Sequence, residues 1–131
     1  MLFAGDAMGI VLSDGPSHAP TPPPAVDLRA WRRTLDEIGE IGPERFGATH
    51  FGIHGDVDTR REQLQSRLDA LEARVRTALH AGDEEDARRY NDEIREEFAP
   101  FMGEDRVGAY FEMFSAAVDW AGVAFYLKRN P

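Results

Sequence analysis

The apolar positions near the start of the chain form short runs that are typical of β-strands rather than helices. Residues 1–12 hold two such runs, with a glycine and an aspartate between them, and predict two short strands or a hairpin-like pair. Residues 13–24 are rich in proline and glycine, which predicts a surface loop without regular structure. A further run at residues 45–49 predicts another strand, followed by a loop over residues 51–56.

A helix is predicted between the proline-rich loop and this last strand. Asp27 is a suitable N-cap, and the helix should run to about Gly39 and be ended by Gly42-Pro43. Its apolar residues recur at helical spacing on one face: Leu28, Trp31, Leu35 and Ile38.

From residue 58 onward the pattern changes to long helices. Thr59 and Glu62 have the spacing of a capping box, which predicts a helix start there. The apolar residues that follow alternate in spacing between four and three: Leu64, Leu68, Leu71, Val75 and Ala78. Gly82-Asp83 should break this helix and cap a second one, with a similar stripe: Ala87, Tyr90, Ile94, Phe98 and Phe101. The two stripes predict an antiparallel helical hairpin.

A third helix is predicted after Pro100 and Gly103. Its apolar positions are Val107, Phe111, Phe114, Val118, Ala121 and Phe125, and further apolar residues widen this face beyond a single seam. Such a helix should be buried on more than one side. The hairpin, the strand-bearing segment or a second subunit would cover it, so we expect a homo-oligomer formed through the C-terminal helices.

Composition narrows the possible functions. A chain of 131 residues suits one small domain or a large fragment of one. The net charge of −9 disfavours binding to nucleic-acid backbones and to anionic membranes. Without cysteine, a metal could bind only to oxygen and imidazole ligands. The most apolar stretch, residues 116–127, is too short to span a bilayer and no signal peptide is visible, so we expect a cytoplasmic protein.

Two residues with metal-binding chemistry stand at predicted strand ends. Asp6 follows an apolar run that ends in a glycine, where the chain can turn and direct a carboxylate away from the sheet. His50 lies forty-four residues later and follows the run Phe46-Gly47-Ala48. On the plainer interpretation, Asp6 caps a turn and His50 is a polar residue at a strand end.

This arrangement resembles the second half of the metallo-β-lactamase fold family. In that family a Gly-Asp after a strand supplies a carboxylate that bridges two metal ions. A later strand ends in the last histidine ligand, often within Thr-His-Phe-Gly, and this chain has Thr49-His50-Phe51-Gly52. The proline-rich loop and the amphipathic helix lie between the two motifs in the family's order. The resemblance covers residues 1–58, but the family's first ligand motif, His-X-His-X-Asp-His, does not occur in this chain.

The resemblance implies a helix-rich α+β fold with few short strands. Residues 1–58 would be the C-terminal part of an αββα sandwich, and residues 59–131 a helical extension made of the hairpin and the long apolar helix. The intact enzyme would use two zinc ions, with Asp6 and His50 among their ligands, to hydrolyse a small-molecule ester, thioester or lactone. Relatives similar to glyoxalase II have a C-terminal helical region that helps to form the substrate pocket. Because zinc takes three or more protein ligands, the isolated chain should bind metal weakly or not at all, and be inactive.

The sequence is also compatible with two alternatives. The chain could be a non-catalytic interaction module that dimerises through residues 59–131. It could also be a small independent metal-binding protein that uses His50, His54 and Asp56, although the nearby glycines favour a loop there.

Other polar residues have simpler explanations. His18, in the proline-rich loop, is expected to be exposed. His80 is expected to interact with the C-terminal dipole of its helix. The acidic residues 83–86 lack the spacing of a calcium loop and suit the first turn of a helix. Asp119 is expected on a helix surface, the alternative being a buried acid with a partner.

Overall fold

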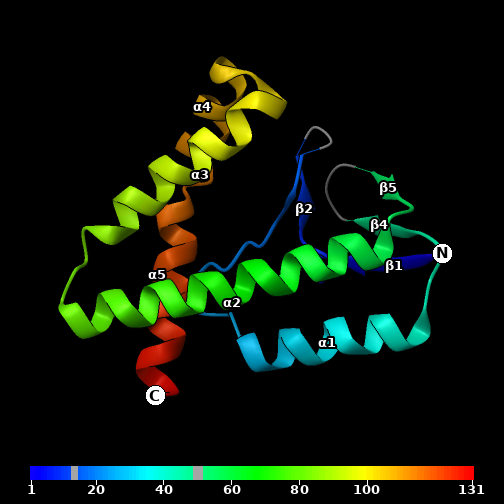
Figure 1. Cartoon of the computed structure of the whole chain (residues 1–131), viewed down its shortest axis with the longest axis horizontal. Helices are drawn as coiled ribbons and strands as arrows, with labels where there is room; N and C mark the ends of the chain where they lie inside the picture. Colours follow the sequence, from blue (N-terminus) through cyan, green and yellow to red (C-terminus); the bar gives the residue numbers. More distant parts are fainter. Residues whose placement is uncertain (13–14, 49–51) are drawn as a thin grey trace. The chain divides into compact units, whose positions relative to one another are not determined.

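The computed structural model describes residues 1–12, 15–48 and 52–131. Over these residues the chain forms five helices and five short strands (Figure 1), which is the helix-rich α+β class expected from the sequence. It divides into two compact units, residues 1–20 with 27–68, and residues 21–26 with 69–131. The domain boundary expected at residue 58 stays a prediction.

The strands of the first unit form two small sheets. In the first, β1 (Leu2–Gly5) lies parallel to β4 (Phe46–Ala48), and β4 pairs antiparallel with β5 (Ile53–His54). In the second, β2 (Ile10–Val11) pairs antiparallel with β3 (Ser17–His18).

The first unit differs from several expectations. Residues 1–12 form two short strands, as one of the two alternatives predicted, but not a hairpin-like pair, because the turn after β1 leads β2 into a different sheet. The proline-rich loop contains β3, and pairing with β2 buries His18, which is only 3% exposed. Residues 51–56 likewise contain β5 in their described part, since Ile53 pairs with Gly47.

The first helix agrees with its sequence signals. Helix α1 (Leu28–Ile41) begins after Asp27, whose side chain accepts a hydrogen bond of 2.9 Å from the amide of Ala30. It ends at Gly42, which has the left-handed φ of 62° that glycine adopts without strain. The face that it buries carries Leu28, Leu35 and Ile38, as the periodicity predicts.

Helix α2 (Val57–Ala81) begins before its predicted cap. Thr59 lies inside the helix, and the carbonyl of Asp56 already accepts from the amide of Arg60 at 3.0 Å. The predicted capping box is therefore wrong. Gly82, with φ of 67°, ends the helix as expected, and His80 lies in the last turn.

The rest of the second unit contains three helices, where the sequence predicted two. Helix α3 (Asp86–Met102) includes Pro100 and packs against α4 (Glu104–Met113) and α5 (Ala116–Arg129). The predicted long third helix is interrupted at Ser115. The Ser115 hydroxyl accepts from the amide of Ala117 at 3.2 Å, and the Asn91 side chain accepts from the amide of Ala116 at 2.8 Å. These caps stabilise a new helix start within an otherwise continuous apolar pattern.

Asp119 is another residue whose expected position is wrong. It is 6% exposed, and its carboxylate accepts from the amide of Thr21 at 2.9 Å. The Thr21 hydroxyl donates in turn to the carbonyl oxygen of Asp119 at 2.8 Å. This pair holds residues 21–26 against α5, and it makes Asp119 a buried acid with a partner.

Candidate functional site

The pairing of β1 with β4 defines the edge of the sheet where the candidate ligands were expected. The two strands are parallel, with Gly5 opposite Ala48, so their carboxyl ends lie at the same edge. Asp6 follows β1 directly and is exposed there. His50 lies outside the described residues, and in the sequence it comes two positions after the end of β4.

The backbone around Asp6 forms two consecutive tight turns. The amide of Ala7 donates to the carbonyl of Ala4 at 3.0 Å, and the amide of Gly9 donates to the carbonyl of Asp6 at 2.9 Å. Gly5 and Gly9 have φ of 57° and 73°, which residues with a Cβ rarely adopt. The turns therefore direct the chain away from the sheet immediately after the strand and leave the Asp6 side chain at its edge.

The weaker candidates lie at the other end of the same sheet. His54 is paired with Phe46, the first residue of β4, and the two rings have centroids 5.3 Å apart. Asp56 accepts a hydrogen bond of 2.9 Å from Nε of Arg60. Since Asp6 adjoins the opposite end of β4, the pairing gives no support to a joint site of Asp6 with His54 and Asp56.

The candidate ligands are of types that bind zinc, but too few of them lie together. A carboxylate oxygen and an imidazole nitrogen are ordinary zinc ligands. Among the described residues, however, no three histidine, aspartate or glutamate side chains are grouped so that they could hold a metal ion. A zinc site at this edge would need ligands beyond those that the described part of the chain supplies.

One face of the same sheet is apolar and open. Phe3, Gly47 and Ile53 lie opposite one another on the three strands, so they share a face. Phe3 is 83% exposed and Ile53 is 57% exposed, while Phe46 on the other face is fully buried. The Phe3 ring lies over Gly47, with its nearest atom 3.2 Å from where a Cβ would stand. An exposed apolar face of this kind is a surface that another element or another chain could cover.

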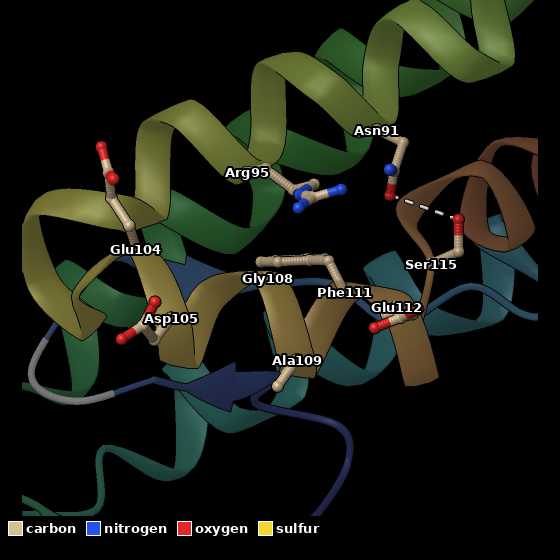
Figure 2. Close-up of a pocket in the computed structure, with 9 residues that line it drawn as sticks. All are labelled: Asn91, Arg95, Glu104, Asp105, Gly108, Ala109, Phe111, Glu112 and Ser115. Atoms are coloured by element: carbon tan, nitrogen blue, oxygen red, sulfur yellow. Dashed lines mark hydrogen bonds between the residues drawn. The ribbon is translucent and has the colours of Figure 1, made fainter.

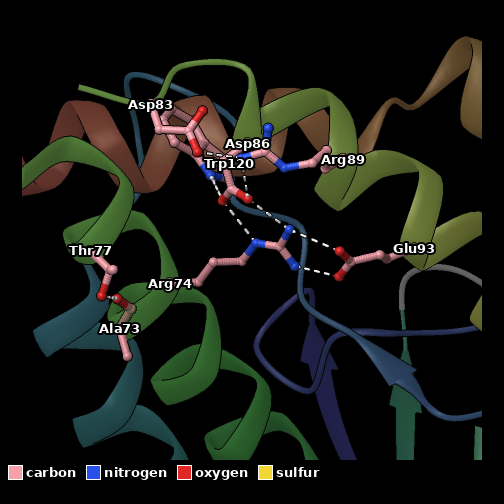
Figure 3. A network of polar contacts seen from close by, with 8 residues as sticks. All are labelled: Ala73, Arg74, Thr77, Asp83, Asp86, Arg89, Glu93 and Trp120. Carbon is pink, nitrogen blue, oxygen red and sulfur yellow. Dashed lines mark hydrogen bonds and ion pairs between the residues drawn. The ribbon is translucent and has the colours of Figure 1, made fainter. Parts of the chain in front are cut away.

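A network of ion pairs occupies the second unit (Figure 3). The Arg74 guanidinium makes two hydrogen bonds of 2.8 Å to the carboxylate of Asp86 and also binds Glu93. The indole of Trp120 donates to the same Asp86 carboxylate at 3.0 Å. Hydrogen bonding from Arg74 is the main reason that the pKa of Asp86 is lowered to about 2. The network links α2, α3 and α5, and its geometry serves structure rather than proton transfer.

From the sequence, the acidic residues 83–86 are expected only to begin a helix. Asp86 does lie in the first turn of α3, but its burial and its partners were not foreseen. Arg74 is one of five arginines in α2, so the sequence contains no signal that distinguishes it from the other arginines of this helix.

An open groove of about 680 Å³ lies between α3 and α4 (Figure 2). Its lining combines one arginine with several acids and a side-chain pair in which Ser115 donates to Asn91: Asn91, Arg95, Glu104, Asp105, Gly108, Ala109, Phe111, Glu112 and Ser115. This mixture provides no nucleophile with an adjacent base.

Comparison with known protein families, with characterised proteins and with solved structures found no match to this chain. Within the described residues, no helix has both the length and the apolar character needed to cross a bilayer.

Proposed function

We propose that this chain is the C-terminal part of a metallo-β-lactamase-fold hydrolase and that Asp6 and His50 belong to its dinuclear zinc site. The observation that carries the proposal is the parallel pairing of β1 with β4, which puts Asp6 beside the end of the strand that leads to His50. These two segments are more than forty residues apart in the sequence, and the resemblance requires them to be neighbours.

The open face of the sheet supports the same proposal. In an αββα sandwich one face of each sheet packs against helices and the other against the second sheet. The buried Phe46 face and the exposed face of Phe3 and Ile53 fit these two roles. We propose that the rest of the sandwich, with the His-X-His-X-Asp-His ligands, covers the exposed face in the intact enzyme.

The chemistry then follows from the ligand types. Bound zinc would lower the pKa of a metal-bound water and polarise the bond to be hydrolysed. The Asp6 carboxylate would place negative charge between two cations that otherwise repel each other. His50 would bind as a neutral imidazole. The proposed substrate is a small ester, thioester or lactone, and the cytoplasmic location expected from the sequence stays part of the proposal.

The test begins with the coding DNA upstream of the Met1 codon, which should encode His-X-His-X-Asp-His in the same reading frame. The chain extended by that segment, here called the extended chain, should bind two zinc ions and hydrolyse a panel of esters, thioesters and lactones. Asp6→Asn should lower activity by at least about a hundredfold, because a two-metal site loses its bridging ligand. Asp56→Asn is the matched control and should retain activity, since Asp56 adjoins the other end of the sheet and pairs with Arg60.

Calorimetric titration with zinc compares the metal affinity of the extended chain with that of the 131-residue chain. The shorter chain should show at most weak zinc binding. Tight, stoichiometric zinc binding by the shorter chain would contradict its proposed inactivity, and an upstream frame without the histidine motif would contradict the fragment proposal.

Exposed apolar side chains in the second unit favour a second candidate function, a helical dimerisation module. Helices α3 to α5 and their junctions carry several large exposed residues: Phe101, Met113, Phe114, Val118 and Phe125. Light scattering should then show a dimer, and Phe114→Asp, just after the end of α4, should dissociate it. Glu112→Asp, at an exposed position in the last turn of α4, is the control and should leave the dimer intact. A monomer at all accessible concentrations excludes this candidate.

A further inference from the structure

The end of α4 exposes apolar side chains that are continuous with the core of the second unit. Met113 is 77% exposed and Phe114 is 58% exposed. The Phe114 ring lies beside the Tyr110 ring, with centroids 5.1 Å apart, and Tyr110 lies against the almost fully buried Phe111, with centroids 5.0 Å apart. These rings form one row from the core to the surface. We call Tyr110, Met113 and Phe114 the apolar patch.

Negative charge is concentrated in the same part of the chain. Residues 91–113 contain seven acidic residues and two arginines, which is a net charge of −5 out of −9 for the whole chain. Three of these acids line the groove between α3 and α4: Glu104, Asp105 and Glu112. Figure 2 shows them along α4, with Arg95 reaching into the groove from α3. The lining of the groove therefore has an excess of negative charge.

The apolar patch adjoins this acidic groove. Glu112 and Ser115 both line the groove, and they flank Met113 and Phe114 directly in the sequence. A segment bound at this end of the groove would contact exposed apolar side chains and carboxylates together.

The charge decides which kind of partner fits this surface. A second copy of the chain would bring its own acidic residues towards the same patch, and like charges repel. A segment that carries lysine or arginine would be attracted to the carboxylates while its apolar side chains cover the exposed rings. A groove between two packed helices suits a further helix, whose apolar residues recur every three or four positions.

We infer that the apolar patch and the acidic groove beside it bind a basic amphipathic helix of another protein. The apolar side chains of the partner would pack on Met113 and Phe114, and its basic side chains would reach the carboxylates of the groove. This interaction needs no metal ion, so it does not depend on the proposed hydrolase.

The first test is a calorimetric titration of the 131-residue chain with a synthetic leucine–lysine peptide. The peptide has about 18 residues, enough to form a helix, with leucine at helical spacing. It should bind with a Kd of about 1–100 μM. A peptide with glutamate in place of lysine should bind at least about tenfold more weakly, because the groove repels it.

Neutral substitutions test the apolar contribution. Phe114→Ser should weaken binding of the leucine–lysine peptide at least about tenfold, because one aromatic side chain can supply much of the affinity of an interface. Met113→Ser should weaken it at least about threefold. Both side chains are largely exposed, so circular dichroism should show an unchanged fold in both variants.

A charge variant tests the carboxylates. Glu104→Gln combined with Glu112→Gln should weaken binding about threefold to tenfold. The matched control is Glu37→Gln combined with Glu40→Gln, which removes the same charge from exposed positions of α1. The control should retain the parent affinity, whereas an equal loss in both double variants would mean that only the net charge of the chain matters and would overturn the inference.

NMR locates the bound peptide. The amide shifts that change on peptide addition should be concentrated in residues 104–115 and absent from α1. Shifts spread over the whole chain, unchanged affinity in Phe114→Ser and Met113→Ser, or no binding at about 1 mM peptide each overturn the inference. A parent chain that is a dimer dissociated by Phe114→Asp assigns the patch to a second copy and overturns it as well.

Discussion

Replacing Gly122 by alanine tests the packing of residues 21–26 against α5. Gly122 is buried within α5, and an added Cβ would stand only 1.6 Å from the carbonyl oxygen of Thr21. Ordinary van der Waals contact requires more than 3.4 Å, so residues 21–26 would have to move away from α5 by about 2 Å. A displacement of that size breaks both hydrogen bonds between Thr21 and Asp119, which are 2.9 and 2.8 Å long.

The two effects of this substitution have opposite signs. In an unobstructed helix, alanine in place of glycine stabilises by about 1 kcal/mol. Here two buried hydrogen bonds are lost, at about 1 kcal/mol each, and desolvation of the Asp119 carboxylate adds about 1–3 kcal/mol. We therefore expect Gly122→Ala to lower the free energy of unfolding by about 3 kcal/mol.

Urea denaturation followed by circular dichroism measures this change. Gly108→Ala in α4 is the matched control, because its nearest neighbour is the flexible end of Arg95 at 3.4 Å. The control should be stabilised by about 0.5–1 kcal/mol. If Gly122→Ala were as stable as the parent chain or more stable, the close approach of Thr21 to α5 would be refuted.

Three further predictions concern stability. The pKa of Asp86 is about 2 in the folded chain, against 3.8 for an ordinary aspartate. Its bond to Arg74 should therefore add about 2 kcal/mol to the free energy of unfolding above pH 4, and this contribution should disappear as the pH falls towards 2. When the free energy of unfolding is measured as a function of pH, Asp86→Asn should lack this decrease between pH 4 and pH 2. Asp27→Ala should lower the free energy of unfolding, measured by urea denaturation, by about 1 kcal/mol. Thr59→Ala should change it by less than about 0.5 kcal/mol, because Thr59 is not a cap. Phe111→Ala should cost about 3–5 kcal/mol by thermal or urea unfolding, since this ring is almost fully buried, and a neutral result would contradict its place in the core.

Local signals in the sequence were sufficient for several elements. Helix α1 begins after Asp27 and ends at Gly42, as predicted, and the run at residues 45–49 contains β4. The buried positions Leu64 and Val75 of α2 also follow from its periodicity. In each case the deciding contacts lie within a few residues along the chain, or on one face of a single helix, so the sequence pattern reports them directly.

Most of the errors occur where a more distant group competes with the local signal. Thr59 is an exception, because there a nearer residue decides: the carbonyl of Asp56 already accepts from the amide of Arg60, so α2 begins before Thr59. The apolar pattern continues through Ser115, yet Asn91 from another helix caps a new start there. The burial of His18 follows from pairing between β2 and β3, which the proline-rich composition did not reveal.

For the candidate site, the sequence by itself determined the residue types: a carboxylate after one strand and a histidine beyond another. Only the tertiary structure decided that these strands are parallel neighbours, that His54 lies at the far end of the sheet, and that Trp31 contacts the turn after Asp6. The β1–β4 pairing and the contact from Trp31 join residues more than twenty positions apart, and the β4–β5 pairing joins Phe46 to His54. The formation of these contacts is governed by packing of the whole unit rather than by local preference.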